Sequence, residues 1–269
     1  MKKKIIIGSR GSKLALLYAE KAKQSIIENN EELNEDSFEI KIIKTEGDIN
    51  QTQRLSEIGG KGLFSKTIEK ELLNKNIDIA VHALKDLPSL ETEGLVAGVY
   101  LKRNDLITKL IRGNVDTRIK KLEENKYQAI ILALAGVKML QKEEKISQIF
   151  SVNEILPSVG QGIISIQSRI EDKKINNIIK KANHEETSLC AIAEREMLKV
   201  LGGDCETAVA GFASIKDKKI YLNCELFSID GMQKFTFNIV DSKYEAKHIG
   251  YKAGISLISQ AGDSYKIKK

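Results

Sequence analysis

The chain has 269 residues, of which 42% are hydrophobic and 30% charged, and it carries a formal net charge of +6. This composition is typical of a soluble globular protein with two or three domains, each able to bury a core. The positive charge favours acidic partners, but aromatic residues make up only 5% and basic residues are spread along the chain. The sequence therefore argues against a nucleic-acid-binding protein.

The sequence indicates neither a disulfide framework nor a metal site. Its three cysteines show no CxxC spacing, and its three histidines are scattered. The apolar run in MKKKIII is too short for a signal peptide, and no stretch reaches the length of a membrane span. We therefore expect a cytoplasmic protein that binds no metal and no membrane.

The first elements are a strand over Lys4–Ile7, a glycine-containing loop and a helix that begins at the N-cap residue Ser12. Arg10 lies at the tip of this loop. A guanidinium there can clamp a carboxylate bidentately, or it can be an ordinary surface group held by a neighbouring aspartate. A half-buried strand over Phe38–Ile42 follows, and after it comes Asp48, either a cleft residue or a turn former.

The segment 45–89 contains a glycine loop, a helix, a buried strand and a polar tip. Gly59, Gly60 and Gly62 precede the helix and form either an anion-binding loop or a flexible turn. The nearly continuous apolar run Ile77–Leu84 is typical of a strand buried on both faces. Lys85 and Asp86 follow it directly. They are either a solvated pair or a site, because ligands of open α/β sheets bind beyond the carboxyl ends of strands.

The middle of the chain predicts a further α/β unit. After a strand over Gly94–Leu101 we expect strands over Ile107–Ile111 and Tyr127–Leu134, with a helix over Val115–Glu124 between them. The loop and first helical turn between these two strands contain Arg112 and Arg118, which are anion ligands or surface charges. Farther along, Gln161 lies between two glycines, ahead of the strand Ile163–Ile166.

The C-terminal third predicts a small α+β domain. Helices are expected over Ile175–Ala182 and Glu185–Val200. Three antiparallel strands follow, over Val209–Ile215, Ile220–Phe227 and Lys234–Val240, and a helix begins near Glu245. Cys190 and Cys224 lie in periodic elements and are interpreted as core residues. Cys205 instead follows Gly202 and Gly203 in a loop, where a core role and a nucleophilic or attachment role are both open.

Several blocks of this sequence resemble those of porphobilinogen deaminases, also called hydroxymethylbilane synthases. They are GSRGSKLAL, GGKGLF, DIAVHALKDLP, RGNVDTRIKKL, LPSVGQGIISIQSR and LGGDCETAVAG. The resemblance implies an α/β protein of three domains. The first two resemble periplasmic binding proteins around a cleft, and the third is a small α+β domain with an antiparallel sheet. Carried onto this chain, domain 1 covers 1–102 and 162–183, domain 2 covers 103–161, and domain 3 covers 184–269.

The resemblance also implies a reaction. The family condenses four porphobilinogen molecules into hydroxymethylbilane, releasing ammonia at each addition, in tetrapyrrole (heme) biosynthesis. By resemblance Asp86 is the catalytic carboxylate, and Cys205 carries a covalently attached dipyrromethane cofactor. The residues implied to bind cofactor and substrate are Arg10, Ser12, Lys85, Arg112, Arg118 and Gln161. We expect a monomer with a small-molecule substrate.

The chain departs from the family most clearly after Asn104. Several dozen residues, including a Ser-Ser-Leu-Arg-Arg type motif, have no counterpart there, so domain 2 is shortened. Met139 also replaces a cleft arginine, Asp204 a glycine and Ala208 a proline. These changes keep a second hypothesis open, a catalytically impaired relative that only binds an anionic small molecule. A third hypothesis, a two-domain solute-binding protein, predicts a secretion signal that the sequence does not show.

Overall fold

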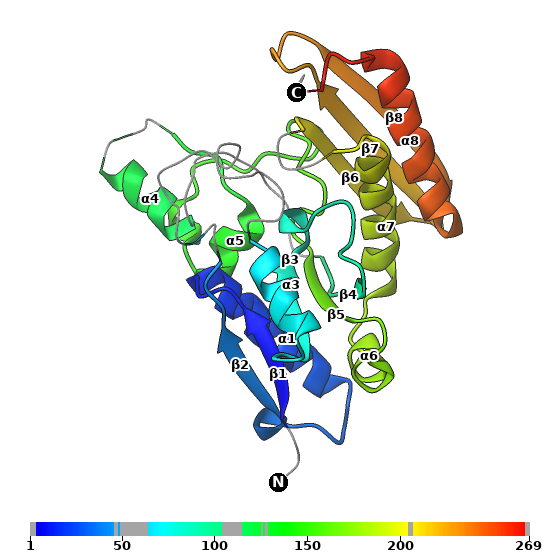
Figure 1. Ribbon diagram of the computed structural model, residues 1–269. Coiled ribbons are helices and arrows are strands. Elements are labelled where there is room, and N and C mark those ends of the chain that lie inside the picture. The colour runs from blue at the N-terminus through cyan, green and yellow to red at the C-terminus, as the bar shows by residue number, and fades with distance from the viewer. Residues whose placement is uncertain are drawn as a thin grey trace.

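A computed structural model describes residues 4–45, 48, 64–103, 115–124, 126, 129–203 and 207–266. Within these ranges the protein is a mixed α/β structure with one five-stranded and one three-stranded sheet (Figure 1). The larger sheet contains β1 (Ile5–Ser9), β2 (Phe38–Ile42), β3 (Ile79–Ala83), β4 (Leu95–Tyr100) and β5 (Ile164–Arg169). None of the helices in the described ranges has the length and apolar character that crossing a membrane requires.

The five-stranded sheet has the order β2-β1-β3-β5-β4. Strand β1 is parallel to β2 and β3, whereas β5 is antiparallel to both β3 and β4. The order brings β5 back between two earlier strands after the chain has passed through the middle segment. The carboxyl ends of β1 and β3 therefore lie at the same edge of the sheet.

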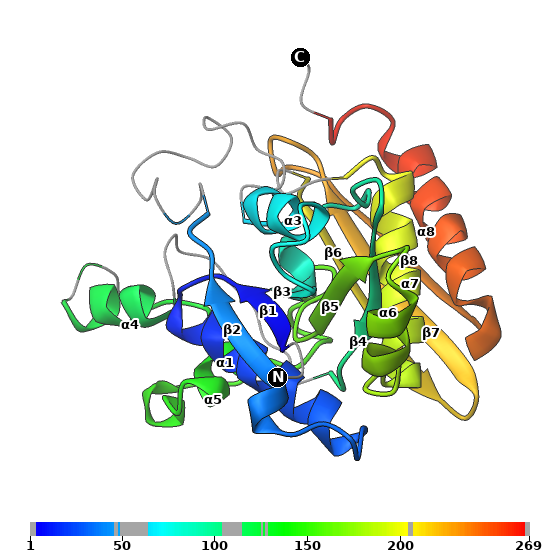
Figure 2. The ribbon, with the colours of Figure 1, turned by 60° about the horizontal axis from the view of Figure 1, so that its bottom comes forward.

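Helices cover both faces of this sheet, as the apolar strands require (Figures 1 and 2). On one face α1 (Lys13–Glu28) and α6 (Lys173–Lys180) pack on a cluster that contains Ile7, Val81 and Ile166. On the other face α3 (Lys66–Leu73) packs on a second cluster. The predicted start of α1 is confirmed, because the Ser12 side chain accepts a hydrogen bond from the backbone N–H of Ala15 at 3.3 Å.

The C-terminal unit contains an antiparallel sheet, as predicted, and two helices cover one of its faces. Its strands are β6 (Val209–Lys216), β7 (Lys219–Phe227) and β8 (Lys234–Ser242), and its helices are α7 (Glu185–Val200) and α8 (Ala246–Ala261). Alternate residues of β7 are buried against the helices, because successive side chains of a strand point to opposite faces. Cys190 and Cys224 lie in this core, which confirms their interpretation.

A buried ion pair joins the two units. The Arg103 guanidinium lies 2.7 Å from Oε1 and 3.0 Å from Oε2 of Glu194, and it also donates to the backbone carbonyls of Gln161 and Ala213. Glu194 in turn accepts hydrogen bonds from the backbone N–H groups of Gly160 and Ala213. The Glu194 side chain is fully buried. This cluster joins both ends of the middle segment, at Arg103 and at Gly160, to the C-terminal unit.

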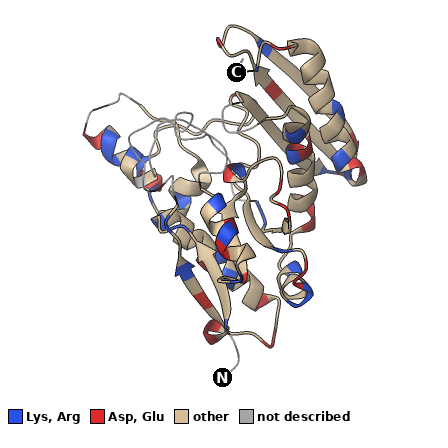
Figure 3. Cartoon of the chain, viewed as in Figure 1, with Lys and Arg blue, Asp and Glu red and all other residues tan. Residues whose placement is uncertain are grey.

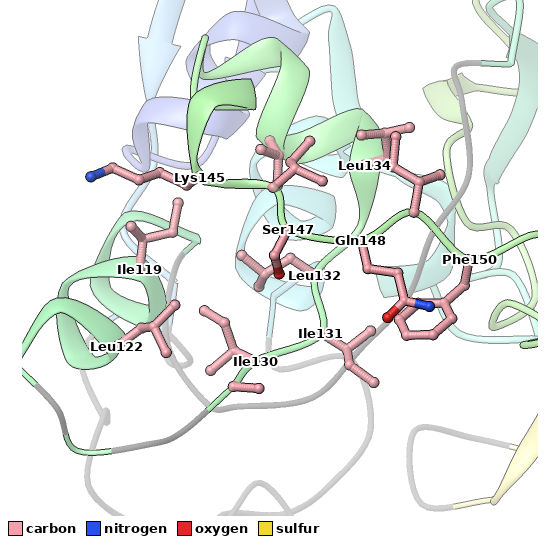
Figure 4. Close-up of a pocket in the computed structure, with 14 residues that line it drawn as sticks. Ile119, Leu122, Ile130, Ile131, Leu132, Leu134, Lys145, Ser147, Gln148 and Phe150 are labelled. Atoms are coloured by element: carbon pink, nitrogen blue, oxygen red, sulfur yellow. The ribbon is translucent and has the colours of Figure 1, made fainter.

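The middle segment contains α4 (Val115–Glu123) and α5 (Leu134–Met139). The prediction of a strand over Tyr127–Leu134 was wrong, since the described residues 129–133 belong to no strand and Leu134 begins α5. A strand needs a neighbour that satisfies its backbone hydrogen bonds, and the described part of this segment supplies none. The apolar side chains instead line a pocket of about 150 Å³ between α4, α5 and the segment 145–150 (Figure 4).

Some predictions from the sequence lie outside the described residues. They are the glycine loop at 59–62, the strand predicted over Ile107–Ile111, and the site residues Arg112 and Cys205.

Candidate active site

The candidate site begins where β3 leaves the sheet. The strand ends at Ala83, and the chain turns at once into a short 3-10 helix over Leu84–Asp86. This turn leaves Lys85 exposed and Asp86 half-buried. Arg10 follows the parallel strand β1 and therefore reaches the same edge of the sheet. The predicted placement of Lys85 and Asp86 at a carboxyl strand end is confirmed.

A cavity of about 330 Å³ lies at this edge. Of the eight site residues predicted from the sequence, the six that the structure describes all line it: Arg10, Ser12, Lys85, Asp86, Arg118 and Gln161. They come from distant parts of the sequence. Topology alone brings them together, because α4 and the turn before β5 lie beside the ends of β1 and β3.

Arg10 is held by a neighbouring aspartate, one of the two alternatives that the sequence left open, and it also lines the cavity. Its guanidinium lies 2.6 Å from the Asp48 carboxylate and stacks over the Phe64 ring at 4.1 Å, while still lining the cavity. Burial alone would raise the pKa of Asp48, but hydrogen bonds from Arg10 and Thr45 outweigh it and hold that pKa below its usual range. The aspartate thus fixes a cation in the cavity wall.

Gln161 is held in place by a tight turn. Gly160, just before it, has a φ of +74°, and a Cβ atom there would lie 3.0 Å from the backbone nitrogen of Lys85. The Gln161 side chain is 4% exposed and accepts a hydrogen bond from Ser158 at 3.3 Å. The turn therefore packs its backbone directly against the chain that carries Lys85 and Asp86, and only glycine fits this approach.

Asp86 faces charged and polar neighbours from three elements. Burial raises the pKa of Tyr18, on α1, to about 12, with a further contribution from the Asp86 charge. Burial lowers the pKa of Arg118, on α4, and the Asp86 charge opposes this shift. His82, on β3, also interacts electrostatically with Asp86. Asp86 is thus a carboxylate that cations and neutral polar groups surround.

Tyr18 and His82 are among the lining residues that the sequence analysis missed. Tyr18 occupies an apolar position of its helix, so its periodicity predicted packing alone. His82 lies inside an apolar strand, where a single polar residue is the signal that was available. A buried polar side chain in such a run needs a partner, and this requirement points to a site.

The C-terminal unit reaches the same loop. The Ser89 hydroxyl donates to the backbone carbonyl of Gly203 at 2.8 Å, and the Arg195 guanidinium donates to the carbonyl of Pro88 at 2.9 Å. Gly203 lies two residues before Cys205 in the sequence. The chain leading to Cys205 is therefore tied to the loop that carries Asp86.

The other two cysteines are poor nucleophiles. Burial raises the pKa of Cys190 and of Cys224 to about 12, and the Glu194 charge adds to both shifts. A thiol with so high a pKa carries almost no thiolate at neutral pH, and the thiolate is the reactive form.

Basic and acidic residues are interspersed along the chain in the cartoon of Figure 3. Helix α4, for example, has Lys120 and Lys121 close to Glu123. Such mixing of charges among the described residues does not favour a nucleic-acid partner. Positive side chains gather instead around the cavity, where Arg10, Lys85, Arg118 and Lys121 line the wall beside Asp86 and Asp48.

Fold and site together define an α/β enzyme whose cavity suits a small molecule with several carboxylates. Two family models match the chain. "Porphobilinogen deaminase, dipyromethane cofactor binding domain" matches residues 5–111 and 99–177, and "Porphobilinogen deaminase, C-terminal domain" matches residues 188–259. The chain belongs to the porphobilinogen deaminase family, the transferases of tetrapyrrole biosynthesis. The function, enzyme class and dipyrromethane cofactor predicted from the sequence are therefore confirmed.

Curated relatives agree with this assignment. The chain is 36% identical to the porphobilinogen deaminase of Coxiella burnetii (strain CbuG_Q212), with 98% of this chain and 97% of the relative covered. It is 34% identical to that of Chlorobium phaeovibrioides and 36% identical to that of Syntrophomonas wolfei, with 95% or more of each chain covered. The first alignment runs over 300 residues for a chain of 269. Dozens of the relative's positions thus have no counterpart here, as expected for a shortened domain 2.

Proposed function

We propose that this porphobilinogen deaminase uses Asp86 as its catalytic carboxylate. When ammonia leaves the substrate, the aminomethyl carbon–nitrogen bond breaks, the electron pair departs with the protonated nitrogen, and positive charge develops on the pyrrole. A half-buried carboxylate in a fixed position stabilises that charge as it forms. The single observation that carries this proposal is the convergence of Asp86 with all five other described site residues on one cavity.

The cations of the cavity would bind the substrate's acetate and propionate groups. Arg10 is pre-positioned by Asp48, so little side-chain freedom is lost when it binds a carboxylate. Lys85 is exposed at the same wall, and Arg118 approaches from α4. Ser12 lines the cavity at the N-terminus of α1, although its hydroxyl oxygen already caps that helix. Arg112, outside the described residues, remains a further proposed ligand.

Cys205 is the proposed attachment point of the dipyrromethane. Two observations support it: the buried, high-pKa state of Cys190 and Cys224, and the hydrogen bond from Ser89 that holds Gly203 beside the Asp86 loop. The cationic lining fits a polycarboxylate cofactor, which Arg10, Lys85 and Arg118 would hold. When bound, the dipyrromethane supplies the primer to which substrate is added.

The finer domain layout is also part of the proposal. Domain 1 would comprise 1–102 and 162–183, domain 2 the shortened segment 103–161, and domain 3 residues 184–269. The clustering of α7, α8 and the antiparallel sheet in one core supports the third domain. The first two domains would enclose the cavity as in periplasmic binding proteins, with the turn at Gln161 in the hinge. We further propose a cytoplasmic monomer, which size-exclusion chromatography and cell fractionation would test.

The catalytic assignment is tested by replacing Asp86 with Asn, which removes the charge and keeps the shape. Turnover of porphobilinogen to hydroxymethylbilane should fall by at least about a hundredfold, while the thermal unfolding midpoint changes little. Glu93→Gln, at an exposed carboxylate near the same loop, is the matched control and should keep wild-type turnover. Near-normal turnover of Asp86→Asn would remove this residue from the mechanism.

The alternative of a relative that only binds an anionic ligand makes a different prediction. Such a protein would bind porphobilinogen in a calorimetric titration without releasing ammonia or hydroxymethylbilane. Steady-state formation of hydroxymethylbilane by the wild-type chain would exclude this alternative.

A further inference from the structure

A chain of buried polar side chains runs from the cavity wall into domain 1. The His82 ring nitrogen Nε2 lies 3.1 Å from Oε1 of Gln167, and Nε2 of Gln167 donates to Oε1 of Glu69 at 3.0 Å. The other carboxylate oxygen of Glu69 accepts from the Thr92 hydroxyl at 2.9 Å. His82 itself lines the cavity. His82, Gln167 and Glu69 thus form one hydrogen-bonded cluster.

The fold determines this arrangement. In the ladder between β3 and β5, Ala80 pairs with Gln167 and His82 pairs with Ser165. Since side chains alternate along a strand, His82 and Gln167 are diagonal neighbours on one face of the sheet. Glu69 reaches them from α3, which covers that face. Glu69 is 4% exposed, His82 7% and Gln167 1%, so none of the three is a surface residue.

The direction of the hydrogen bonds indicates which ring nitrogen of His82 carries a proton. A carboxylate that accepts from Thr92 turns the amide NH₂ of Gln167 towards itself, and the amide oxygen must then face the ring. The ring nitrogen Nε2 therefore carries the proton. The Gln167 amide accepts this N–H and separates the Glu69 carboxylate from the ring, so the carboxylate does not pair with the imidazole directly.

The electrostatic surroundings agree with a neutral ring. Burial lowers the pKa of His82, and Arg10 lowers it further. The charges of Glu69 and Asp86, and the hydrogen bond that His82 donates to Gln167, oppose this shift without reversing it. Among the described residues, Glu69 on α3, Asp86 after β3 and Arg10 after β1 are thus the charged groups that act on the ring.

We propose that His82 is a positioning residue of the cavity wall that it shares with Asp86, and that Gln167 and Glu69 hold its ring neutral so that no imidazolium competes for the catalytic carboxylate. The inference rests on the proposed role of Asp86. The cavity already contains Arg10, Lys85 and Arg118. A further positive charge in this wall would compete with the charge that develops on the substrate, and Coulomb interactions are stronger in a half-buried site than in bulk water.

An exchange of two side chains tests the proposal. The double variant Glu69→Gln with Gln167→Glu keeps one carboxylate and one amide of nearly the same shape, but it places the carboxylate directly against the ring. This contact should raise the pKa of His82 and make the ring an imidazolium at neutral pH. We expect kcat at pH 7 to fall about tenfold or more with KM little changed, and to recover as the pH rises above the new pKa.

A neutral replacement at His82 provides the matched control. His82→Gln keeps an N–H donor towards position 167 and cannot take a charge. In the exchanged background it should restore most of the lost turnover, which a purely structural defect would not allow. If the exchanged protein does not fold, His82→Ala and His82→Gln in the original background replace it. His82→Ala, which loses the hydrogen bond to Gln167, should lower kcat with little change in KM. His82→Gln, which keeps a donor there, should have a higher kcat than His82→Ala.

The charge of the ring is read separately by NMR of protein with ¹⁵N-labelled histidine, with the His82 signal assigned from the His82→Gln spectrum. The proposal expects a neutral ring protonated at Nε2 in the wild type at pH 7, and an imidazolium after the exchange. An imidazolium in the wild type, or an exchanged protein with a charged ring and unchanged kcat, would overturn it. Failure of the wild type to form product would instead refute the proposed function.

Discussion

The Ser89 hydroxyl lies 2.8 Å from the carbonyl oxygen of Gly203 and joins two segments that are far apart in the sequence. Ser89 follows Asp86 by three residues, and Gly203 precedes Cys205 by two. The proposed catalytic carboxylate and the proposed attachment residue thus belong to loops that are hydrogen-bonded to each other. Through this contact the C-terminal unit reaches the loop that follows Asp86.

Ser89→Ala should weaken this connection without disturbing the fold. Loss of one hydroxyl that donates to a carbonyl costs about 1 kcal/mol in the free energy of unfolding. We expect that loss together with slower turnover, because the two loops lose a fixed separation. The matched control is Ser264→Ala, which removes an equivalent hydroxyl-to-carbonyl bond of 2.7 Å at the end of α8. Equal turnover of the two variants would show that the contact has no role in catalysis.

Gly160→Ala should impair the site through backbone contact. Both Gly160 and Gly231 have positive φ angles, so an alanine at either position is strained by about 1–2 kcal/mol. A Cβ atom at Gly160 also meets the Lys85 backbone at 3.0 Å, whereas at Gly231 it meets nothing within 4 Å. We expect lower kcat for Gly160→Ala alone, measured beside the unfolding midpoints. An equal fall in kcat for Gly160→Ala and Gly231→Ala would contradict this expectation.

The buried Arg103–Glu194 pair should contribute strongly to stability. Arg103→Ala leaves the fully buried Glu194 carboxylate without its cation, which costs about 3–5 kcal/mol in such cases. Lys234→Ala breaks the partly exposed pair with Glu225 and should cost less than about 1 kcal/mol. Urea unfolding of both variants checks the difference. A loss below about 1 kcal/mol for Arg103→Ala would mean that the junction is held by other contacts.

Stability should depend on pH through His82. Its pKa is lowered in the folded protein, first by burial, so the unfolded chain takes up a proton near pH 6.5 while the folded ring does not. Unfolding is therefore favoured as the pH falls below about 6.5, by at most about 1.4 kcal/mol per pH unit, and this contribution is constant well above it. Denaturant unfolding between pH 5 and 8 should show that the free energy of unfolding falls less steeply toward low pH in His82→Gln than in the wild type. Identical slopes would argue against a depressed pKa.

Much of this fold was predictable because its signals are local. Apolar runs predicted the buried strands β1 and β3, and alternation with a turn at Gly231 predicted the pairing of β7 and β8. The middle segment was not, because an apolar run such as 129–133 indicates burial but does not say whether a partner strand exists. Its isoleucines line an apolar pocket (Figure 4).

The site, like the fold, was predictable only in part. Residues at strand ends, such as Arg10 and Asp86, were predicted because topology places them at one edge. The Asp48 partner of Arg10 and the contact between Ser89 and Gly203 depend on distances across the fold that the sequence does not encode locally. Met139, which the resemblance places at a cleft position, instead packs against the core cluster of the five-stranded sheet.

The most direct measurement is the intact mass of the purified full-length protein after incubation with porphobilinogen, followed by peptide mapping. A chain heavier by one dipyrromethane, with the added mass on the peptide that contains Cys205 and absent from Cys205→Ser, is the predicted result. An unmodified wild-type chain, or an adduct on Cys190 or Cys224, would contradict the proposal that Cys205 anchors the cofactor of an active porphobilinogen deaminase.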